Sequence, residues 1–262
     1  MTRDPALSRR SMLGLLAGGA ALAAGVRPTG AAPSRISTLI VEAQALPSLA
    51  DRIAFISRSL LGTPYRGATL IGGPELPEQF VTRDDCFDCV TFCESVLAAA
   101  MARTPGDYPA VLRAMRYRGG LVDWRERNHY FSEWSENNIA NGMVRPVFVP
   151  GSVATDKPLG WMPELGERRM TLRAIPRASL LAHRHRLSTG VIIGFISERP
   201  NLDFFHTGFV VIGAGGGLWL RHASKSKRRV LDEKLERFLN ASRGRAVTLL
   251  RAEEARADEM IA

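Results

Sequence analysis

All three cysteines of this 262-residue chain lie within eight residues, in the segment Asp84-Asp85-Cys86-Phe87-Asp88-Cys89-Val90-Thr91-Phe92-Cys93-Glu94. An acidic, loop-like approach leads here into an apolar stretch, Val90–Met101, whose composition predicts a helix. Cys89 therefore stands at or near a helix N-terminus, where unpaired backbone N–H groups and the helix dipole favour negative charge. A thiolate is the nucleophilic form of cysteine, so we expect this position to lower the pKa of Cys89. We interpret Cys89 as a candidate catalytic nucleophile.

A thiol nucleophile needs a base and a third polar group that orients the base. Among the five histidines, His206 and His222 lie in or beside two predicted strands, on either side of the turn-like segment Gly213–Gly217. If the two strands pair across this turn, the histidines come within about one residue pair, a separation of ~5–8 Å. His222 could then orient His206. Either histidine alone is more simply a solvated or locally bonded residue, and it is the pairing that favours catalysis. Of the remaining three, His183 and His185 are most simply solvated. His129 could line a substrate groove, although a local hydrogen bond is the simpler role.

The spacing of Cys86 and Cys89 also matches a thioredoxin-type redox motif. That motif belongs with a βαβ pattern, whereas helices precede this segment and Cys93 follows one turn later. A zinc site would need all three cysteines and a fourth ligand from the far half of the chain. We therefore expect no metal and no cofactor, and we expect Cys93 to be a small buried side chain. In an oxidising compartment, a Cys86–Cys89 disulfide would silence the nucleophile.

The first 31 residues have the features of an export signal. Ser8-Arg9-Arg10-Ser11-Met12-Leu13 is a twin-arginine pattern, and the weakly apolar run Leu13–Val26 is too short for a comfortable membrane span, which needs roughly 20 residues. Small residues at Thr29-Gly30-Ala31-Ala32 offer a cleavage site. We expect residues 1–31 to be removed and the product to be soluble, in the periplasm or outside the cell. An uncleaved helical anchor is the alternative.

Composition is consistent with one domain over residues 32–262, because 45% of the chain is hydrophobic and can form one sizeable core. The formal net charge of +9 suits anionic partners such as cell-wall polymers, membrane surfaces or nucleic acid, although a solvated, arginine-rich surface is the simpler explanation. The sequence contains no nucleic-acid-binding motif and no basic helix with interleaved aromatic residues, so we expect no nucleic-acid partner.

Helix-like patterns come first and strand-like patterns second, which indicates an α+β fold. The predicted helices are Ile36–Ala45, Leu49–Leu61, Val90–Met101, Tyr108–Tyr117 and Leu231–Leu239. The predicted strands are Met143–Val149, Met170–Ile175, Val191–Ser197, Phe209–Gly213, Leu218–Ala223 and Ala246–Leu250. The loops are a Gly- and Pro-rich approach to the cysteine segment, an irregular aromatic stretch at 119–134, and Pro150–Pro163. Arg177–Arg186 is too poorly periodic to assign.

Four short segments stand in the order of a known family: Gly62-Thr63-Pro64-Tyr65, Asp88-Cys89-Val90-Thr91-Phe92, His206-Thr207-Gly208 and His222-Ala223-Ser224. The chain resembles the bacterial N-acetylmuramoyl-L-alanine amidase-like proteins, in the NlpC-type branch of the papain-like cysteine peptidases. Further similar segments are Tyr117-Arg118-Gly119-Gly120, His129-Tyr130-Phe131-Ser132-Glu133-Trp134 and Asn201-Leu202-Asp203. The resemblance covers most of residues 32–262.

This resemblance implies a papain-like α+β fold, with N-terminal helices and a nucleophile-bearing helix packed on a small antiparallel sheet. It implies that Cys89 is the nucleophile, His206 the base, His222 its orienter, and Tyr65 a neighbour that binds substrate or steadies the oxyanion. A family-specific insertion around 104–187 would restrict the substrate. The sequence departs from the family pattern at Cys86, Cys93 and Val191.

The implied reaction is hydrolysis of the amide between N-acetylmuramic acid, possibly its anhydro form, and L-alanine in peptidoglycan fragments. These muropeptides would be the partners of a monomer that has no stable membrane insertion after signal cleavage. The stem peptide carries carboxylates that could meet one of several arginines: Arg66, Arg83, Arg118 or Arg125. Two alternatives stay open, a stem-peptide endopeptidase of the same fold and, in another class, an inactive wall-binding module.

Overall fold

A computed structural model describes residues 34–242 and 245–254; the predicted export signal at 1–31 lies outside these residues. The α-helices within this part are α1 (Arg35–Ala43), α2 (Leu49–Ser59), α3 (Cys89–Met101), α4 (Tyr108–Arg116), α5 (Phe131–Ala140), α6 (Arg177–Ala182) and α7 (Leu235–Ala241). The strands are β1 (Ile71–Gly73), β2 (Leu76–Gln79), β3 (Val144–Pro146), β4 (Val153–Leu159), β5 (Arg168–Pro176), β6 (Ile192–Ile196), β7 (Phe204–Ile212), β8 (Leu218–Ser224), β9 (Arg229–Lys234) and β10 (Ala246–Ala252). No helix of this part is both long and apolar enough to cross a membrane.

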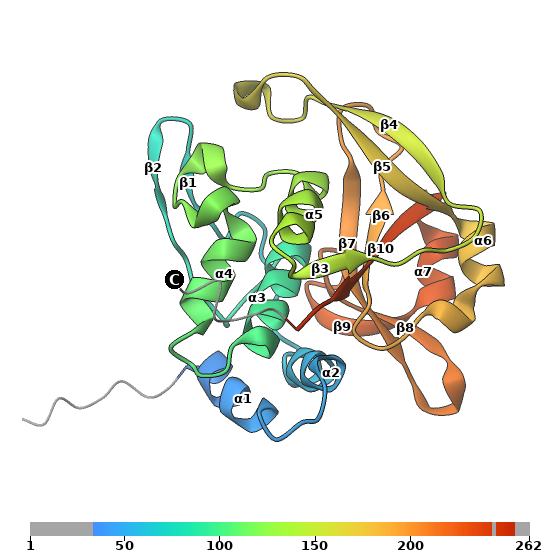
Figure 1. Cartoon of the computed structure of the whole chain (residues 1–262), viewed down its shortest axis with the longest axis horizontal. Coiled ribbons are helices and arrows are strands. Elements are labelled where there is room, and N and C mark those ends of the chain that lie inside the picture. The colour runs from blue at the N-terminus through green and yellow to red at the C-terminus, as the bar shows by residue number, and fades with distance from the viewer. Residues whose placement is uncertain (1–33, 243–244, 255–262) are drawn as a thin grey trace, which may run out of the picture. The chain divides into compact units, whose positions relative to one another are not determined.

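An eight-stranded antiparallel sheet forms the centre of the domain. Its strand order is β4-β5-β10-β6-β7-β8-β9, and β3 pairs with the end of β10 on the side where β5 pairs with its beginning. Strands β1 and β2 form a separate hairpin. Helices α1 to α5 gather on one side of the sheet and α6 and α7 on the other (Figure 1). The predicted mixture of leading helices and a following antiparallel sheet is confirmed, although the sheet is larger than expected.

Two hydrophobic clusters cover the two faces of this sheet, and strand β6 contributes to both. Ile192 and Ile196 belong to the cluster that contains the N-terminal helices, whereas Ile193 and Phe195 belong to the cluster under α7. Successive side chains of a strand point to opposite faces, so a strand with a core on each side reads as an unbroken apolar run. This explains why β6 was recognisable in the sequence.

Helix α3 is the central helix and is buried almost completely after its first turn. It packs against α1, α2 and α4 and against strands β7 and β8. Asp88 caps its N-terminus: the carboxylate accepts from the N–H groups of Val90 (3.0 Å) and Thr91 (2.8 Å), and the Thr91 hydroxyl accepts from the Asp88 N–H (2.9 Å). This reciprocal capping box fixes the helix start at Cys89, one residue before the predicted Val90.

Several elements differ from the sequence-based expectation, mostly where a polar segment gains structure from its neighbours. Strand β4 replaces the loop predicted at Pro150–Pro163; its mostly exposed residues pair along their whole length with β5. The hairpin β1–β2 lies within a stretch predicted as loop. The predicted helix Leu231–Leu239 is wrong in its first half, because residues 229–234 pair with β8 as strand β9 before α7 begins.

Helix α5 was also missed, because its sequence contains few apolar residues at helical spacing. A buried carboxylate from the far half of the chain stabilises its first turn. Asp203 accepts hydrogen bonds from the N–H and the hydroxyl of Ser132, both at 2.7 Å, and from the N–H of Phe204, also at 2.7 Å. Asp203 therefore ties the start of α5 to the start of β7, which carries His206.

Removal of the Asp203 carboxylate should destabilise the domain. The substitution Asp203→Ala leaves three buried donors without an acceptor, and we expect the free energy of unfolding to fall by about 2–4 kcal/mol. Denaturant unfolding followed by circular dichroism measures this change. The matched control is Asp156→Ala, because Asp156 is exposed and bonds only the hydroxyl of Thr171 in the described part of the chain. Equal unfolding midpoints for the two variants would contradict the anchoring role.

Candidate active site

Cys89 is the first residue of α3, and its thiol meets strand β7 at the backbone of Thr207. The backbone N–H groups of Thr207, Cys89 and Val90 act on the sulfur and lower the thiol pKa. Deeper in the same interface, the Cys93 sulfur lies 4.0 Å from the hydroxyl of Thr207. The structure therefore brings Cys89 to the residue that directly follows His206 in the chain.

The expected lowering of the Cys89 pKa is wrong for the resting thiol. Burial and the adjacent Asp88 carboxylate outweigh the backbone N–H groups and raise the pKa to about 12. The helix N-terminus does favour negative charge, but the carboxylate of Asp88 already occupies that position and accepts two of its N–H groups. A second anion beside Asp88 is therefore unfavourable, and Cys89 rests as a neutral thiol.

His206 and His222 lie side by side, as the predicted strand pairing requires. The Nε2 atom of His206 and the Nδ1 atom of His222 are 2.6 Å apart, a hydrogen-bond distance, and the rings meet edge to face. His222 is 1% exposed and His206 is half-buried. Burial lowers the pKa of His206 to about 3, with a further contribution from His222, and burial lowers the pKa of His222 to about 4. Both imidazoles are therefore neutral at pH 7.

The register of β7 and β8 explains how the rings meet. His206 lies inside strand β7 and not before it as predicted, and it pairs with Phe195 of β6. Between the two histidines stands Gly208. A Cβ atom at this glycine would lie 2.9 Å from the Cβ of His222 and 2.7 Å from the carbonyl oxygen of Arg221. The absence of a side chain at 208 thus allows the close approach of β8 to β7.

Two residues that the sequence did not single out complete the surroundings of the histidine pair. The ring of Phe238, from α7, lies 5.3 Å from the His206 ring and 5.4 Å from the His222 ring, and it shields both from water. Glu233 of β9 places a carboxylate oxygen 3.7 Å from the free Nε2 of His222. Neither has a local sequence signal: Phe238 was predicted only as part of a helix, and Glu233 reaches His222 through the pairing of β8 with β9.

Tyr65 borders Cys89, as the family resemblance implies. Its pKa is raised by burial and then by the nearby Cys89 and Asp88. The segment that carries Tyr65 is held by backbone bonds on both sides. Its N–H donates to the Arg228 carbonyl (2.9 Å), and Tyr65 pairs in parallel with Phe87, two residues before Cys89.

Through the described contacts, His206 touches His222 and Cys89 touches Thr207 and Tyr65, whereas the other predicted residues lie apart from both pairs. His129 bonds the carbonyl of Trp124, and His183 bonds that of Ser179, so both make local hydrogen bonds. His129 also lines the cavity of about 340 Å³ beside the start of α3. All three cysteines are free, and Cys86 and Cys93 are buried. Within residues 34–242 and 245–254, no three His, Cys, Asp or Glu side chains form a cluster suited to a metal ion.

A cavity of about 340 Å³ opens beside the start of α3 and is lined by Asp88, Val90 and Thr91 on one side and by the beginning of α5 on the other. Its wall contains a buried ion pair, Glu94–Arg116, at 2.8 Å. Two further lining residues, Thr69 and Trp134, each hold a buried polar atom without a hydrogen-bond partner in the described chain. The wall of this cavity, beside the first residues of α3, thus contains an ion pair and two unpaired polar atoms, all buried.

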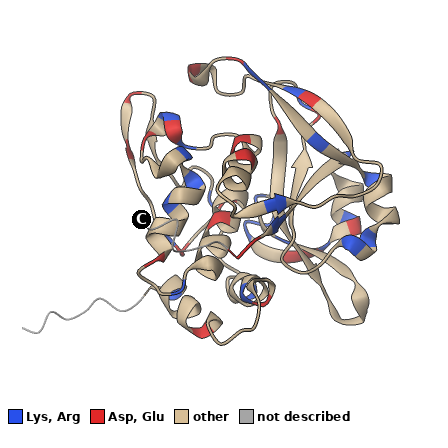
Figure 2. Cartoon of the chain, viewed as in Figure 1, with Lys and Arg blue, Asp and Glu red and all other residues tan. Residues whose placement is uncertain are grey.

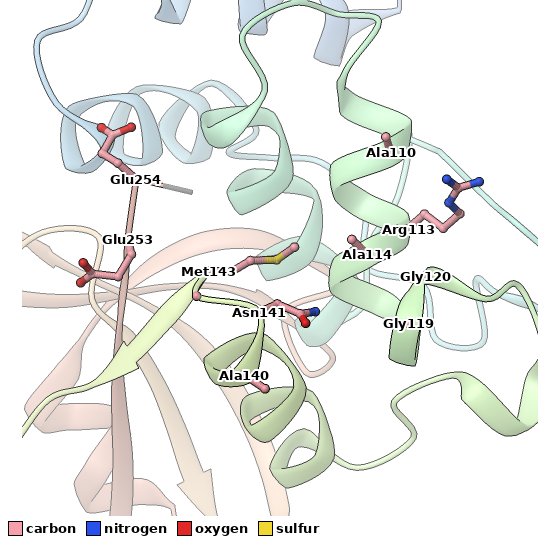
Figure 3. Close-up of a pocket in the computed structure, with 11 residues that line it drawn as sticks. Ala110, Arg113, Ala114, Gly119, Gly120, Ala140, Asn141, Met143, Glu253 and Glu254 are labelled. Atoms are coloured by element: carbon pink, nitrogen blue, oxygen red, sulfur yellow. The ribbon is translucent and has the colours of Figure 1, made fainter. Parts of the chain in front are cut away.

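A larger cavity, of about 690 Å³, lies elsewhere, around the end of α5 and the side of α4 (Figure 3). Ala140 and Asn141 line it, whereas Phe131 at the other end of α5 lines the cavity beside Cys89. A ten-residue helix spans about 15 Å, so the two cavities are separate. Neither cavity is lined by Tyr65, Cys89, His206 or His222; the smaller one is lined by the neighbours of Cys89 in the chain, Asp88 and Val90.

The closeness of the histidine pair should depend on Gly208. We expect Gly208→Ala to push β8 from β7, lengthen the His206–His222 hydrogen bond and destabilise the protein by about 1–3 kcal/mol. Ring-nitrogen chemical shifts measured by NMR report the hydrogen bond, and denaturant unfolding reports the stability. Gly217→Ala, in the same hairpin, is the control: its φ is −66°, and its added Cβ would meet nothing closer than 3.6 Å. An unchanged histidine spectrum in Gly208→Ala would contradict this account.

Comparison with solved structures shows that several bacterial proteins share this fold. An N-acetylmuramoyl-L-alanine amidase from Bacteroides uniformis matches with 23% identity and a TM-score of 0.69, over 78% of this chain and 99% of that one. A Legionella pneumophila protein matches with 22% identity and a TM-score of 0.73, over 83% and 93%. A putative xylanase from Bacteroides fragilis matches with 25% identity and a TM-score of 0.60, over 74% and 98%. No curated protein matches the sequence.

The family model described as N-acetylmuramoyl-L-alanine amidase-like matches residues 55–245. This range includes Tyr65, Cys89, His206 and His222 and most of the chain. The chain therefore belongs to the N-acetylmuramoyl-L-alanine amidase-like family, which supports a peptidoglycan amidase-like enzymatic function.

Proposed function

We propose that this protein is a cysteine hydrolase that cleaves the amide between N-acetylmuramic acid and L-alanine in peptidoglycan fragments, during cell-wall turnover. The observation that carries the proposal is the 2.6 Å contact between His206 and His222. His206 lies on strand β7, and the next residue of that strand, Thr207, meets the Cys89 thiol. Membership of the amidase-like family supports the choice of bond. Muramic acid in its anhydro form is part of the proposal, as are the NlpC-type relationship and export to the periplasm or beyond by the twin-arginine route.

In the proposed mechanism His206 accepts the proton of Cys89. Its Nε2 is engaged by His222, so Nδ1 is the nitrogen that remains for the thiol. If His206 donates from Nε2 to Nδ1 of His222, then Nδ1 of His206 is unprotonated and can act as a base. His222 in this state carries its proton on Nε2, which faces the carboxylate of Glu233 at 3.7 Å. The Glu233 carboxylate thus favours the tautomer that makes His206 a base.

The thiol and imidazole are both neutral at rest, so the proton moves when the sulfur attacks the carbonyl carbon. The sulfur forms a thioester with the carbonyl carbon, the C–N bond breaks, and the amine leaves with the proton that His206 returns. Water then gives a proton to His206 and attacks the thioester. This releases the muramic acid carboxyl group, and the proton returns from His206 to the Cys89 sulfur. The backbone N–H of Cys89 and the hydroxyl of Tyr65 are the donors proposed for the oxyanion. The cavity beside Asp88 would hold the substrate next to the sulfur.

The first test is digestion of muropeptides that carry intact or anhydro-muramic acid, followed by mass spectrometry. We expect the protein without residues 1–31 to release free stem peptide that begins with L-alanine. Cys89→Ala should abolish this release, and His206→Ala should reduce it by at least ~10²-fold, because general base catalysis contributes about 10²–10⁴-fold. Cys86→Ala is the matched control and should keep its activity, since Cys86 lies outside the proposed triad.

The other outcomes of this digestion are equally informative. Cleavage within the stem peptide would replace the proposed amidase with an endopeptidase of the same fold. No cleavage under reducing conditions, with muropeptide binding retained, would favour the inactive wall-binding module. Full activity in Cys89→Ala would exclude Cys89 as the nucleophile.

The low pKa values of the buried histidines predict the pH dependence. A base whose pKa is lowered from 6.5 to about 3 stays unprotonated as the pH falls below neutrality, so kcat/KM should be nearly constant from pH 8 to about 5 and fall below about 4. The Cys89 thiol, with a pKa near 12, should add no rise up to pH 9. The measurement uses muropeptides whose stem carboxylates are amidated, so that titration of the substrate does not contribute to the pH profile. An acid limb with its midpoint near 6.5 would contradict the neutral pair.

A further inference from the structure

The turn between β8 and β9, together with the first residue of β9, carries four basic residues within five positions: Lys225, Lys227, Arg228 and Arg229. All four side chains are exposed. The turn has a defined shape, because the Ser224 hydroxyl accepts from the N–H of Lys227 (3.3 Å) and lies 3.2 Å from the Ser226 hydroxyl. Arg228 adopts a left-handed backbone conformation, with φ of 59°. We call these four residues and Ser226 the basic turn.

The basic turn lies next to the segment that carries Tyr65. The Tyr65 N–H donates to the Arg228 carbonyl (2.9 Å), and Pro64 forms an antiparallel bridge with Arg229. On its other side, Tyr65 pairs with Phe87, which stands two residues before Cys89. Adjacent paired backbones lie about 4.8 Å apart, so the basic turn is about 10 Å from the chain that leads into Cys89.

The charges of the basic turn are not neutralised by the rest of the described chain. No ion pair to an acidic side chain is formed by any of the four within residues 34–242 and 245–254. Elsewhere, acidic and basic residues are interspersed (Figure 2). Two of the arginines first considered for carboxylate binding already have acidic partners, since Arg83 pairs with Asp85 and Arg118 with Glu126. The basic turn is thus a better candidate for binding an external anion than either of these arginines.

We infer that the basic turn binds the carboxylates of the stem peptide while its muramyl end lies at Cys89, an inference that rests on the proposed function. An extended peptide advances about 3.3–3.6 Å per residue, so carboxylates two or three residues beyond the cleaved bond lie about 7–10 Å from it. That reach matches the separation of the basic turn from the cysteine segment. Flexible lysines and arginines can follow carboxylates at several positions along the stem, whereas an uncharged stem would gain little.

The test compares two variants that each lose two exposed positive charges. Lys225→Gln/Lys227→Gln removes charge from the basic turn, and Arg184→Gln/Arg186→Gln removes it from an exposed 3-10 turn after α6. Both are made in the Cys89→Ala background, and calorimetry measures the Kd of the free peptide L-alanyl-γ-D-glutamyl-diaminopimelate. We expect about a five-fold higher Kd for the basic-turn variant and a change below about two-fold for the control.

Two further measurements separate charge recognition from a change of shape. With 0.5 M NaCl the binding of the peptide should weaken in the parent and much less in the basic-turn variant, because salt screens exposed charges. A peptide with all its carboxylates amidated should bind both variants equally. In the active enzyme the same lysine substitutions should raise KM and leave kcat unchanged, as expected for a group that binds substrate and transition state alike.

Equal effects of the two variants on Kd, or a difference that persists with the amidated peptide, would overturn the inference. Peptide binding is measured without turnover, so the binding experiment can succeed or fail independently of the digestion that tests the proposed function. Cleavage of muropeptides with unaltered binding in the basic-turn variant would remove this inference alone. Turn-dependent binding without any cleavage would support the carboxylate site and remove the proposed hydrolase.

Discussion

The burial of helix α3 between the N-terminal helices and the sheet is the constraint on which the candidate site depends. The helix is mostly apolar, and its polar Glu94 is neutralised by Arg116, so nearly every face of it can be covered. Its first turn, which begins at Cys89, is less buried than the rest of the helix and meets strand β7 at the backbone of Thr207. Cys89 is the residue at that point. Edge-to-face contact between Phe92 and Phe209 (5.8 Å) joins the helix to the same strand.

The electrostatics of the site follow from this burial and not from the helix dipole. The Asp88 carboxylate caps the helix N-terminus, so the negative charge that this N-terminus favours is supplied by Asp88 and not by a thiolate. Low polarity around His206 and His222 likewise disfavours their protonated forms. The result is a neutral thiol at the backbone of Thr207 and a neutral imidazole pair that begins one residue earlier on the same strand. Such a pair avoids the cost of burying separated charges until the substrate is present.

Backbone pairing holds the Tyr65 segment next to the chain that leads into the cysteine. The segment at Tyr65 forms bonds with the strand after the basic turn on one side and with Phe87 on the other. Three stretches that are far apart in the sequence are thereby held side by side at the spacing of a sheet. Tyr65 shares one hydrogen bond with the β8–β9 turn, through its N–H and the Arg228 carbonyl.

Much of the fold and of the candidate site could be predicted from the sequence alone. The apolar run after Cys89 determined a buried helix, and the glycine-rich turn between two apolar strands determined that His206 and His222 would meet. These features depend on residues that are close in the sequence, so local propensity and register specify them. The same reasoning failed for α5 and β4, whose polar sequences acquire their structure from Asp203 and from β5.

Only the tertiary structure decided the protonation of the site. The sequence places a cysteine at a helix N-terminus, and that placement alone predicts a low thiol pKa. The pKa of Cys89 is instead raised, by burial and by the capping carboxylate of Asp88, and both depend on how the helix meets the sheet. The shielding of both histidines by Phe238 has the same origin. Solvation and long-range contacts are properties of the assembled chain, whereas the identities and spacing of Cys89, His206 and His222 were determined by the sequence by itself.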